Sequence, residues 1–321
     1  MRYFRNLTFA AAMLGCGAIA AVAQETYPEK PITFLVPYAA GANGDIVARI
    51  LANALQPELG QPLVVENRPG AGGNIGAAEV AHEDADGYTI MLATNTHAIN
   101  QTLYPDAGYE LRNDFAPVSM ISSAPMVLLV NAQSDASSVE EFLNLAKDGQ
   151  LSYSSGGNGA SGHLFMELFS QQAGIELAHI PYPGVAAAVT DLLAGRVDST
   201  FSTTASTAEV VKDGQLRALA IAAPSRSDIM PDVPTLTESG IADMEDGIWQ
   251  GIVVPDGTSQ DRIDILNTAI ANVLAQDEVK TQLAQQGLDA RPSTPADFGT
   301  LIENEIARWN VVIERAGITL E

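Results

Sequence analysis

Strand patterns and helix patterns alternate along almost the whole chain. The apolar run at 32–36 is typical of a buried strand, and apolar residues then recur with helical spacing over 45–59. The alternation continues to a C-terminal part that is nearly all helical from Gln260 onward. It indicates parallel sheets flanked by helices, so it predicts an α/β protein. The expected strands are 32–36, 63–65, 89–92, 126–130, 151–153, 178–180, 197–201, 216–222 and 251–254, and the expected helices before Gln260 are 45–59, 77–81, 139–146, 164–172, 186–193 and 208–213.

The pattern restarts after the apolar strand expected at 126–130, which predicts a second lobe. A mature chain of about 300 residues is long enough for two domains of ordinary size. We therefore expect lobe I to be formed by 24–128 plus 249–321 and lobe II by 129–248. Two lobes joined by crossing strands leave a cleft between them. Ligands of open α/β sheets bind beyond the carboxyl ends of the strands, so this cleft is the expected binding site.

The first 23 residues have the layout of a secretory signal peptide. Arg2 and Arg5 precede an apolar run over 7–22, which ends in Ala21-Val22-Ala23. We expect cleavage after Ala23 and export to the periplasm, and a permanent transmembrane anchor is the weaker interpretation. The single cysteine, Cys16, lies in this segment, so lipid attachment there stays open as an alternative. Cleavage after Ala23 leaves a mature chain without cysteine and hence without disulfides.

The chain is strongly acidic. Its formal charge is −23, and removal of Arg2 and Arg5 with the leader gives −23 − 2 = −25 for the mature protein. Such a charge makes nucleic acid and anionic lipid surfaces poor partners. Solubility is the simplest interpretation of this acidity.

Three expected strands are followed by loops of small residues that lead directly into a helix. These loops are 37–45, 67–76 and 154–161. Glycine allows the backbone to approach an anion closely, and the free N–H groups of the first helical turn then point at it. Glycine also forms ordinary tight turns, so a single loop of this kind is a weak indication. Three of them, spread over two lobes, favour an anion-binding cleft.

Enzyme motifs fit these loops poorly. The run at 70–75 lacks the third glycine of a dinucleotide-binding loop, and no loop ends in the Gly-Lys-Ser/Thr of a P-loop. The sequence at 159–163 has His163 where a nucleophile elbow requires glycine. No carboxylate pair stands out, and we expect neither a cofactor nor a metal. The histidines are scattered without metal-ligand spacing, at His82, His97, His163 and His179.

A long collinear set of motifs points to one family. The set comprises Pro31-Ile32 with Val36-Pro37-Tyr38 and Asp45, the run from Gly60 to Gly76, Asp86-Gly87-Tyr88-Thr89, Asp114-Phe115-Ala116-Pro117-Val118, Pro181-Tyr182-x-Gly184, Asp191-Leu192-Leu193-x-Gly195, Leu216-Arg217-Ala218-Leu219-Ala220 and Pro231-Asp232-Val233-Pro234-Thr235. With these motifs, the chain resembles the tripartite tricarboxylate transporter receptors, also called Bug proteins. The resemblance covers essentially the whole mature chain, and it is specific for the family but not for the ligand.

The resemblance implies a type II periplasmic binding protein fold, in which two α/β lobes close on a ligand in the cleft between them. It further implies a monomeric, non-enzymatic receptor that holds a carboxylate through main-chain N–H groups and water and delivers it to membrane permease subunits. The lobe I contacts implied are Tyr38, Ala40, Gly41, Ala42, Asn43, Gly44, Asn74, Thr94, Asn95 and His97. The lobe II contacts implied are Ser155, Gly157, Asn158, Gly159, Ser161, Tyr182, Gly184, Ser202 and Thr203.

The chain departs from the family pattern in ways that concern the ligand. The first loop has less proline and glycine than is usual, Pro183 replaces a frequent lysine, and the frequent acid near Ser202 is absent. Loss of that acid removes a partner for an amino group, which favours a plain carboxylate over an amino acid. Citrate, aliphatic dicarboxylates and aromatic acids all stay open, as do an exported enzyme on the same scaffold and a receptor that acts on a signalling partner.

The expected cleft segments contain no lysine or arginine. They are 37–45, 70–76, 93–100, 154–161, 181–187 and 199–204. We therefore expect backbone N–H groups and Ser, Thr, Asn and Tyr side chains to hold the anion. Closure on the ligand is also expected, because the contacts lie on both lobes.

Overall fold

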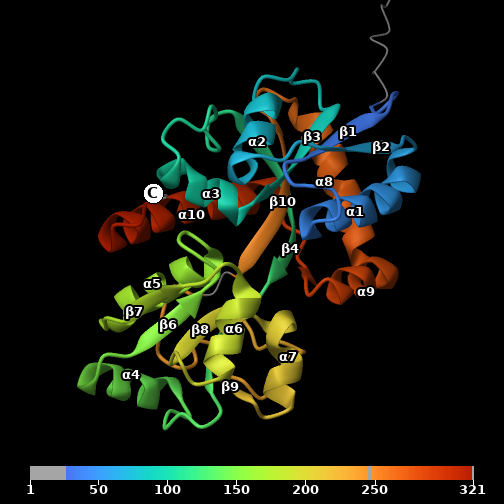
Figure 1. Cartoon of the computed structure of the whole chain (residues 1–321). Helices are drawn as coiled ribbons and strands as arrows, with labels where there is room; N and C mark the ends of the chain where they lie inside the picture. The colour runs from blue at the N-terminus through green and yellow to red at the C-terminus, as the bar shows by residue number, and fades with distance from the viewer. Residues whose placement is uncertain (1–26, 245–246, 320–321) are drawn as a thin grey trace, which may run out of the picture.

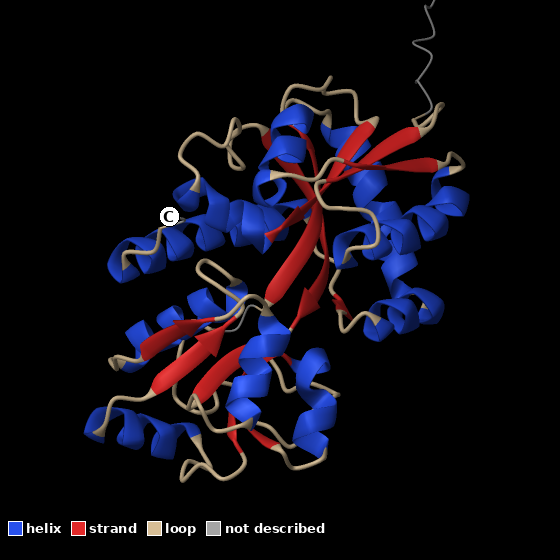
Figure 2. Cartoon of the chain, in the orientation of Figure 1, coloured by secondary structure: helices blue, strands red, loops and turns tan. Residues whose placement is uncertain are grey.

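Two β-sheets, each flanked by helices, make up the two lobes of the protein (Figures 1 and 2). The computed structural model describes residues 27–244 and 247–319, so the expected leader and Cys16 lie outside the described residues. Within that part of the chain, no helix combines the length and the apolar character needed to cross a bilayer. The α/β class and the two-lobed architecture predicted from the sequence are confirmed.

Lobe I is built on a six-stranded sheet with the order β11-β4-β10-β3-β1-β2. Its strands are β1 (Ile32–Val36), β2 (Leu63–Asn67), β3 (Thr89–Thr94), β4 (Phe115–Ala124), β10 (Ile248–Pro255) and β11 (Asp289–Ala290). Its helices are α1 (Asn43–Leu59), α2 (Asn74–Val80), α3 (Asn95–Leu103), α8 (Gln260–Ala275), α9 (Asp277–Gln285) and α10 (Pro295–Ala316), with a short 3₁₀ turn, η1 (Ala71–Gly73), before α2.

Lobe II is built on a five-stranded sheet with the order β7-β6-β8-β5-β9. Its strands are β5 (Met126–Asn131), β6 (Ser152–Ser155), β7 (Ala178–Pro181), β8 (Ser199–Thr203) and β9 (Leu216–Ala222). Its helices are α4 (Val139–Asp148), α5 (Ser161–Ala173), α6 (Val185–Leu193) and α7 (Thr204–Lys212).

The prediction of parallel sheets is wrong in part. β1, β2 and β3 are parallel, as are β6, β7 and β8, but β10 is antiparallel to β3 and β4, and β5 is antiparallel to β8 and β9. The reason is the path of the chain between the lobes. β4 leads out of lobe I and β10 leads back into it, so these neighbouring strands must run in opposite directions (Figure 1).

The outward crossing is short. β4 ends at Ala124 and β5 begins at Met126, so Pro125 alone separates a strand of lobe I from a strand of lobe II. The return is longer, and residues 223–244 of it are mostly irregular. The short crossing at Pro125 is suited to act as a hinge between the two lobes.

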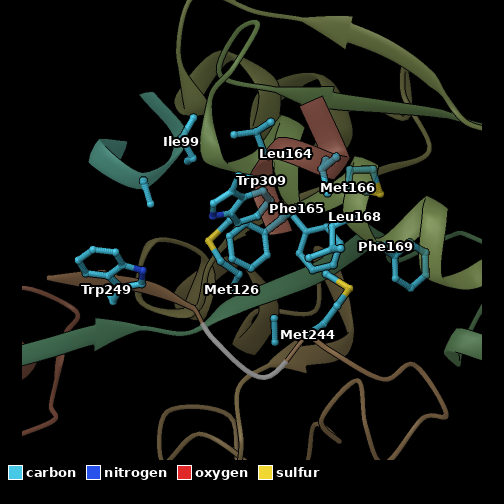
Figure 3. Close-up of a cluster of buried hydrophobic side chains, with 14 of the residues drawn as sticks. Ile99, Met126, Leu164, Phe165, Met166, Leu168, Phe169, Met244, Trp249 and Trp309 are labelled. Carbon is cyan, nitrogen blue, oxygen red and sulfur yellow. The ribbon is translucent and has the colours of Figure 1, made fainter. Parts of the chain in front are cut away.

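A shared hydrophobic cluster joins the lobes beside the hinge. Trp309 of α10 packs against Phe165 of α5, with a ring-centroid distance of 5.5 Å (Figure 3). The indole N–H groups of Trp309 and Trp249 both donate to the buried carboxylate of Glu305, over 2.8 and 3.1 Å. The C-terminal helix, a lobe I element, therefore contacts lobe II through its apolar face.

We expect Gly251→Ala to destabilise the protein, because a Cβ there would overlap the buried ring of Phe298. Overpacking of this kind costs about 1–3 kcal/mol, which corresponds to a fall in Tm of several degrees. Gly299→Ala is the matched control, since its Cβ would meet only Pro117, at 3.2 Å, and alanine favours the helix. Differential scanning calorimetry measures both, and equal Tm values for the two variants would contradict the packing described for β10.

Candidate ligand-binding site

The strands β1, β2 and β3 end at one edge of the lobe I sheet, where hydrogen bonds tie their loops together. The hydroxyl of Tyr38, after β1, lies 2.6 Å from Oγ1 of Thr94 at the end of β3. The side-chain amide of Asn67, the last residue of β2, donates to the carbonyl oxygen of Tyr38 over 3.0 Å. The parallel register therefore brings together three segments that are far apart in the sequence.

Asp45, in the first turn of α1, braces the loop after β1. Its buried carboxylate accepts hydrogen bonds from Gly41 N–H (2.8 Å), Asn67 Nδ2 (3.0 Å) and the guanidinium of Arg49 (2.9 and 3.0 Å). The hydrogen bond from Arg49, with those from Gly41 and Asn67, lowers the pKa of Asp45 to about 2. Asp45 is therefore ionised at neutral pH, and the N–H of Gly41 is engaged within the protein.

The loop after β2 approaches α3 closely. Gly72 and Gly73 have φ angles of +66° and +98°, which favour glycine, and they lead into Asn74 at the start of α2. Oδ1 of Asn74 accepts from Asn100 Nδ2 (2.7 Å) and from the hydroxyl of Tyr109 (3.0 Å). The amide nitrogen of the same side chain, Nδ2, is buried and has no hydrogen-bond acceptor among the described residues.

His97 is a neutral, fully buried imidazole beneath these loops. Its Nδ1 accepts a hydrogen bond from the main-chain N–H of Thr94 over 3.0 Å, so the ring proton sits on Nε2. Burial lowers the pKa of His97 to about 4. The rings of Tyr38 and Tyr109 flank the imidazole at 6.1 and 6.2 Å, and a Cβ on Gly73 would lie 3.0 Å from Nε2.

Three buried N–H donors at this edge have no hydrogen-bond partner among the described residues. They are Nδ2 of Asn74, Nδ2 of Asn95 and Nε2 of His97. Buried polar groups in folded proteins nearly always have a partner, because an unpaired donor costs about 1–3 kcal/mol. All three side chains were predicted site residues, and each has a buried N–H donor that no described residue accepts.

Lobe II presents a matching edge where β6, β7 and β8 end. The N–H of Tyr182, after β7, donates to the carbonyl oxygen of Ser155 at the end of β6 over 3.0 Å. Gly156 packs so closely on the start of α6 that a Cβ there would lie 3.2 Å from the main-chain nitrogen of Val185. The loop after β6 and the turn after β7 are therefore one packed unit.

Several predicted side chains of lobe II are engaged within the lobe. The hydroxyl of Tyr182 donates to Asp191, which also pairs with Arg196, so the phenol is held by α6. Oγ of Ser202 lies 3.0 Å from Oγ of Ser206. Two further bonds fix the loop after β6, from Gly159 N–H to His163 Nδ1 and between Ser155 Oγ and His179 Nε2. None of these partner residues was among the predicted contacts, because nothing in their spacing links them to the loop.

Most of the helices that begin at these two edges share one property. The cap residues of α1, α2, α5, α6 and α7 make no side-chain hydrogen bond to the first turn. α3 differs, because Thr94 and His97 form a capping box at its start. Away from these edges, Ser138 caps α4 and Thr294 caps α10 through side-chain oxygens, whereas α8 and α9 lack such a bond. Uncapped first turns leave main-chain N–H groups available to an anion, at the positive end of each helix dipole.

The cations nearest these loops are neutralised by acids. Arg49 pairs with Asp45, Arg68 with Glu66 and Glu79, and Arg196 with Asp191. Across residues 27–244 and 247–319, no group of three His, Cys, Asp or Glu side chains could hold a metal ion. Neutral donors therefore dominate both edges.

The structure groups the predicted residues into two sets, one at each edge. Ala40, Gly41, Asn43 and Asn158 are exposed, whereas Asn74, Asn95 and His97 are buried. The two lobes also touch beside α7, where a Cβ on Gly287 would overlap Ala205. A hollow of about 850 Å³ near Asn131, Gly195 and Gly214 lies at the opposite ends of the lobe II strands and includes none of the predicted residues.

Comparisons with known proteins agree on one family. Residues 47–318 match the family described as tripartite tricarboxylate transporter family receptor. Protein BugT of Bordetella pertussis is 36% identical over 98% of this chain and 100% of its own. A TctC solute-binding protein from Polaromonas, solved with no ligand, superposes with a TM-score of 0.85 at 30% identity, over 90% of this chain and 99% of its own. An R. palustris protein solved with adipate superposes with a TM-score of 0.70 at 34% identity, over 91% of this chain and 99% of the R. palustris chain.

We expect His97 to make stability depend on pH. Its pKa is about 4 in the folded protein against about 6.5 when unfolded, so its contribution is complete above pH 6.5 and is lost as pH falls toward 4. One proton corresponds to about 1.4 kcal/mol per pH unit, or about 3 kcal/mol over this range. In His97→Asn, Oδ1 can still accept from Thr94 N–H but does not titrate. Urea unfolding from pH 7 to 4 should therefore give a shallower slope for the variant, and identical slopes would show that His97 is not buried as a neutral ring.

Proposed function

Because the chain belongs to the tripartite tricarboxylate transporter receptor family, we propose that it binds a small carboxylate between its two lobes and delivers it to the membrane permease subunits of such a transporter. The observation that carries this proposal is the pair of donor-rich edges, one on each lobe, built almost entirely from neutral N–H and O–H groups. The leader expected at 1–23 supports action in the periplasm.

Local donors can hold an anion in spite of the acidic surface. Repulsion from distant charges is screened beyond about 8 Å at physiological salt. A hydrogen bond to a charged group contributes about 1.5–3 kcal/mol, and a few such bonds outweigh the screened repulsion. Uncapped helix starts and the side chains of Asn74, Asn95 and His97 are suited to supply these bonds.

The choice of a plain carboxylate rests on the chemistry of both edges. The ammonium group of an amino acid is held best by a carboxylate, whereas the side chains of Ser202 and Thr203 are neutral hydroxyl groups. The R. palustris relative solved with adipate supports a dicarboxylate of similar size. We therefore assign the ligand to small carboxylates without an amino group, which include di- and tricarboxylates and aromatic acids.

We propose that the lobes close on the ligand. The chain superposes better with the relative solved without ligand (TM-score 0.85) than with the one solved with adipate (0.70), although the sequence identities are close. A change in the angle between two rigid lobes lowers the score of a whole-chain superposition in this way. The short crossing at Pro125 is suited to such a rotation.

We propose that the protein has no catalytic activity of its own. The nearest approach to a nucleophile and base is Ser155 with His179, whose Oγ and Nε2 atoms are 2.6 Å apart. Ser155 is buried and its hydroxyl also bonds to Gly157, and no carboxylate orients the imidazole among the described residues. This pair therefore serves the loop in which it lies.

The proposed mode of binding is tested by isothermal titration calorimetry with adipate and related acids, chosen by a thermal-shift screen, because a ligand of the native state raises apparent stability. The acids should bind, and the corresponding amides should bind at least 100-fold more weakly because they lack the charge. Gly157→Val should abolish binding, since φ at Gly157 is +127° and valine cannot keep that loop geometry.

The controls are Arg49→Gln, Arg68→Gln and Arg196→Gln, each of which removes a cation that is already paired with an acid. Each should change affinity less than tenfold. Loss of all binding in one of these variants would contradict the proposed mode, because it would show that an arginine holds the ligand through an ion pair. Binding of none of the carboxylates screened would contradict the proposed ligand class.

A further inference from the structure

Two stacked imidazoles lie directly beneath the loop between β6 and α5. The rings of His163, on α5, and His179, on β7, are parallel within 15°, with centroids 3.8 Å apart. The ring of Tyr153, on β6, stacks on that of His179 at 4.8 Å and lies 6.2 Å from that of His163. The family match and the proposed ligand mode give these two histidines no role.

Each imidazole is bonded to a different arm of the loop. Nδ1 of His163 accepts a hydrogen bond from the main-chain N–H of Gly159 over 3.1 Å. Nε2 of His179 lies 2.6 Å from Oγ of Ser155, and that oxygen bonds in turn to both the N–H and the carbonyl oxygen of Gly157. Glycines with φ angles of +127° and +72°, Gly157 and Gly159, have little conformational restraint of their own, so these bonds set the shape of the loop.

We propose that His163 and His179 are positioning residues, which hold the loop 155–159 in its ligand-binding shape only while His163 is neutral. The consequence for affinity rests on the proposed function, whereas the consequence for the loop does not. Protonation of His163 at Nδ1 converts the acceptor into a donor, which removes the bond from Gly159. Two charged imidazoles at 3.8 Å would also repel each other.

The surroundings favour the neutral ring. Burial, followed by the proximity of His179, lowers the pKa of His163 to about 4, and burial lowers that of His179. The other titratable groups of this stack are Tyr153 and Glu167, and Glu167 accepts from the hydroxyl of Tyr153 over 2.6 Å. Beyond Glu167 lie Glu176 and Arg315, at the rim of a separate hollow. Among the described residues, no carboxylate bonds to either imidazole to stabilise a charged form.

The direction of the effect follows from linkage. A detached loop exposes His163, whose pKa then returns toward about 6.5, so protons favour the detached state as pH falls from 6.5 toward 4. Affinity for an anionic ligand should fall over the same range, in addition to any protonation of the ligand itself. At neutral pH the loop should be fully attached.

Hydrogen exchange of the ligand-free protein tests the proposal without any ligand. After correction for intrinsic exchange rates, protection of the peptide that covers 155–161 should fall at least tenfold between pH 7.0 and 4.5 in the wild type. His163→Asn should keep its protection within threefold at both pH values, because Oδ1 of asparagine replaces Nδ1 as the acceptor and does not titrate. His163→Leu, which has no acceptor, should lose protection at pH 7.0 already.

Adipate affinity of the same variants forms the second arm. The ratio of the Kd of the wild type to that of His163→Asn should rise from pH 7.0 to 4.5 as the attached fraction of the wild-type loop falls, and protonation of adipate cancels in this ratio. Equal pH dependence of loop protection in wild type and His163→Asn would overturn the proposal, as would full protection in a folded His163→Leu. If His163→Leu does not fold, the comparison of wild type with His163→Asn decides. The expected exchange without adipate binding would contradict adipate as a ligand and would leave the role of the two histidines in the loop supported.

Discussion

Main-chain N–H groups in the first turn of a helix have no partner within the helix, and the helices that follow β1, β2, β6, β7 and β8 begin without a side-chain acceptor for them. These helices follow parallel strands, so their first turns gather at one edge of each lobe. The acidic surface and the neutral edges are compatible for this reason. In the proposed mode of binding, short-range dipoles meet the charge of the ligand, while the net charge of the protein acts through screened solvent.

Small residues permit close approach of an anion, but they give the loops little conformational restraint. Hydrogen bonds from polar side chains behind the loops fix the loop conformation instead. In lobe I, Asp45 holds Gly41, and Asn100 with Tyr109 holds Asn74. In lobe II, the two stacked imidazoles hold the loop after β6. Residues outside the predicted contacts, such as Asp45, Asn100 and His163, therefore help to shape the loops.

The sequence predicted the features that depend on local signals. Loops at 37–45, 67–76 and 154–161 were recognisable because glycine and small residues precede helical patterns. The antiparallel direction of β5 and β10 could not be predicted, since an apolar run carries no information on strand direction. The sequence analysis did not predict β4, because serines and Pro117 interrupt its apolar pattern. It did not predict α3, because most residues of that helix are polar. Bracing contacts such as Asp45 with Asn67 join residues 22 positions apart, so only the fold brings them together.

Division of the donors between two lobes requires that the ligand bring the lobes together. Small-angle X-ray scattering, with and without a saturating carboxylate, measures this most directly. The account predicts a smaller radius of gyration in the liganded protein, and the same change should be absent with the corresponding amide. An unchanged radius of gyration at saturation would contradict it, because the ligand would then be held by one lobe or by lobes that are already closed.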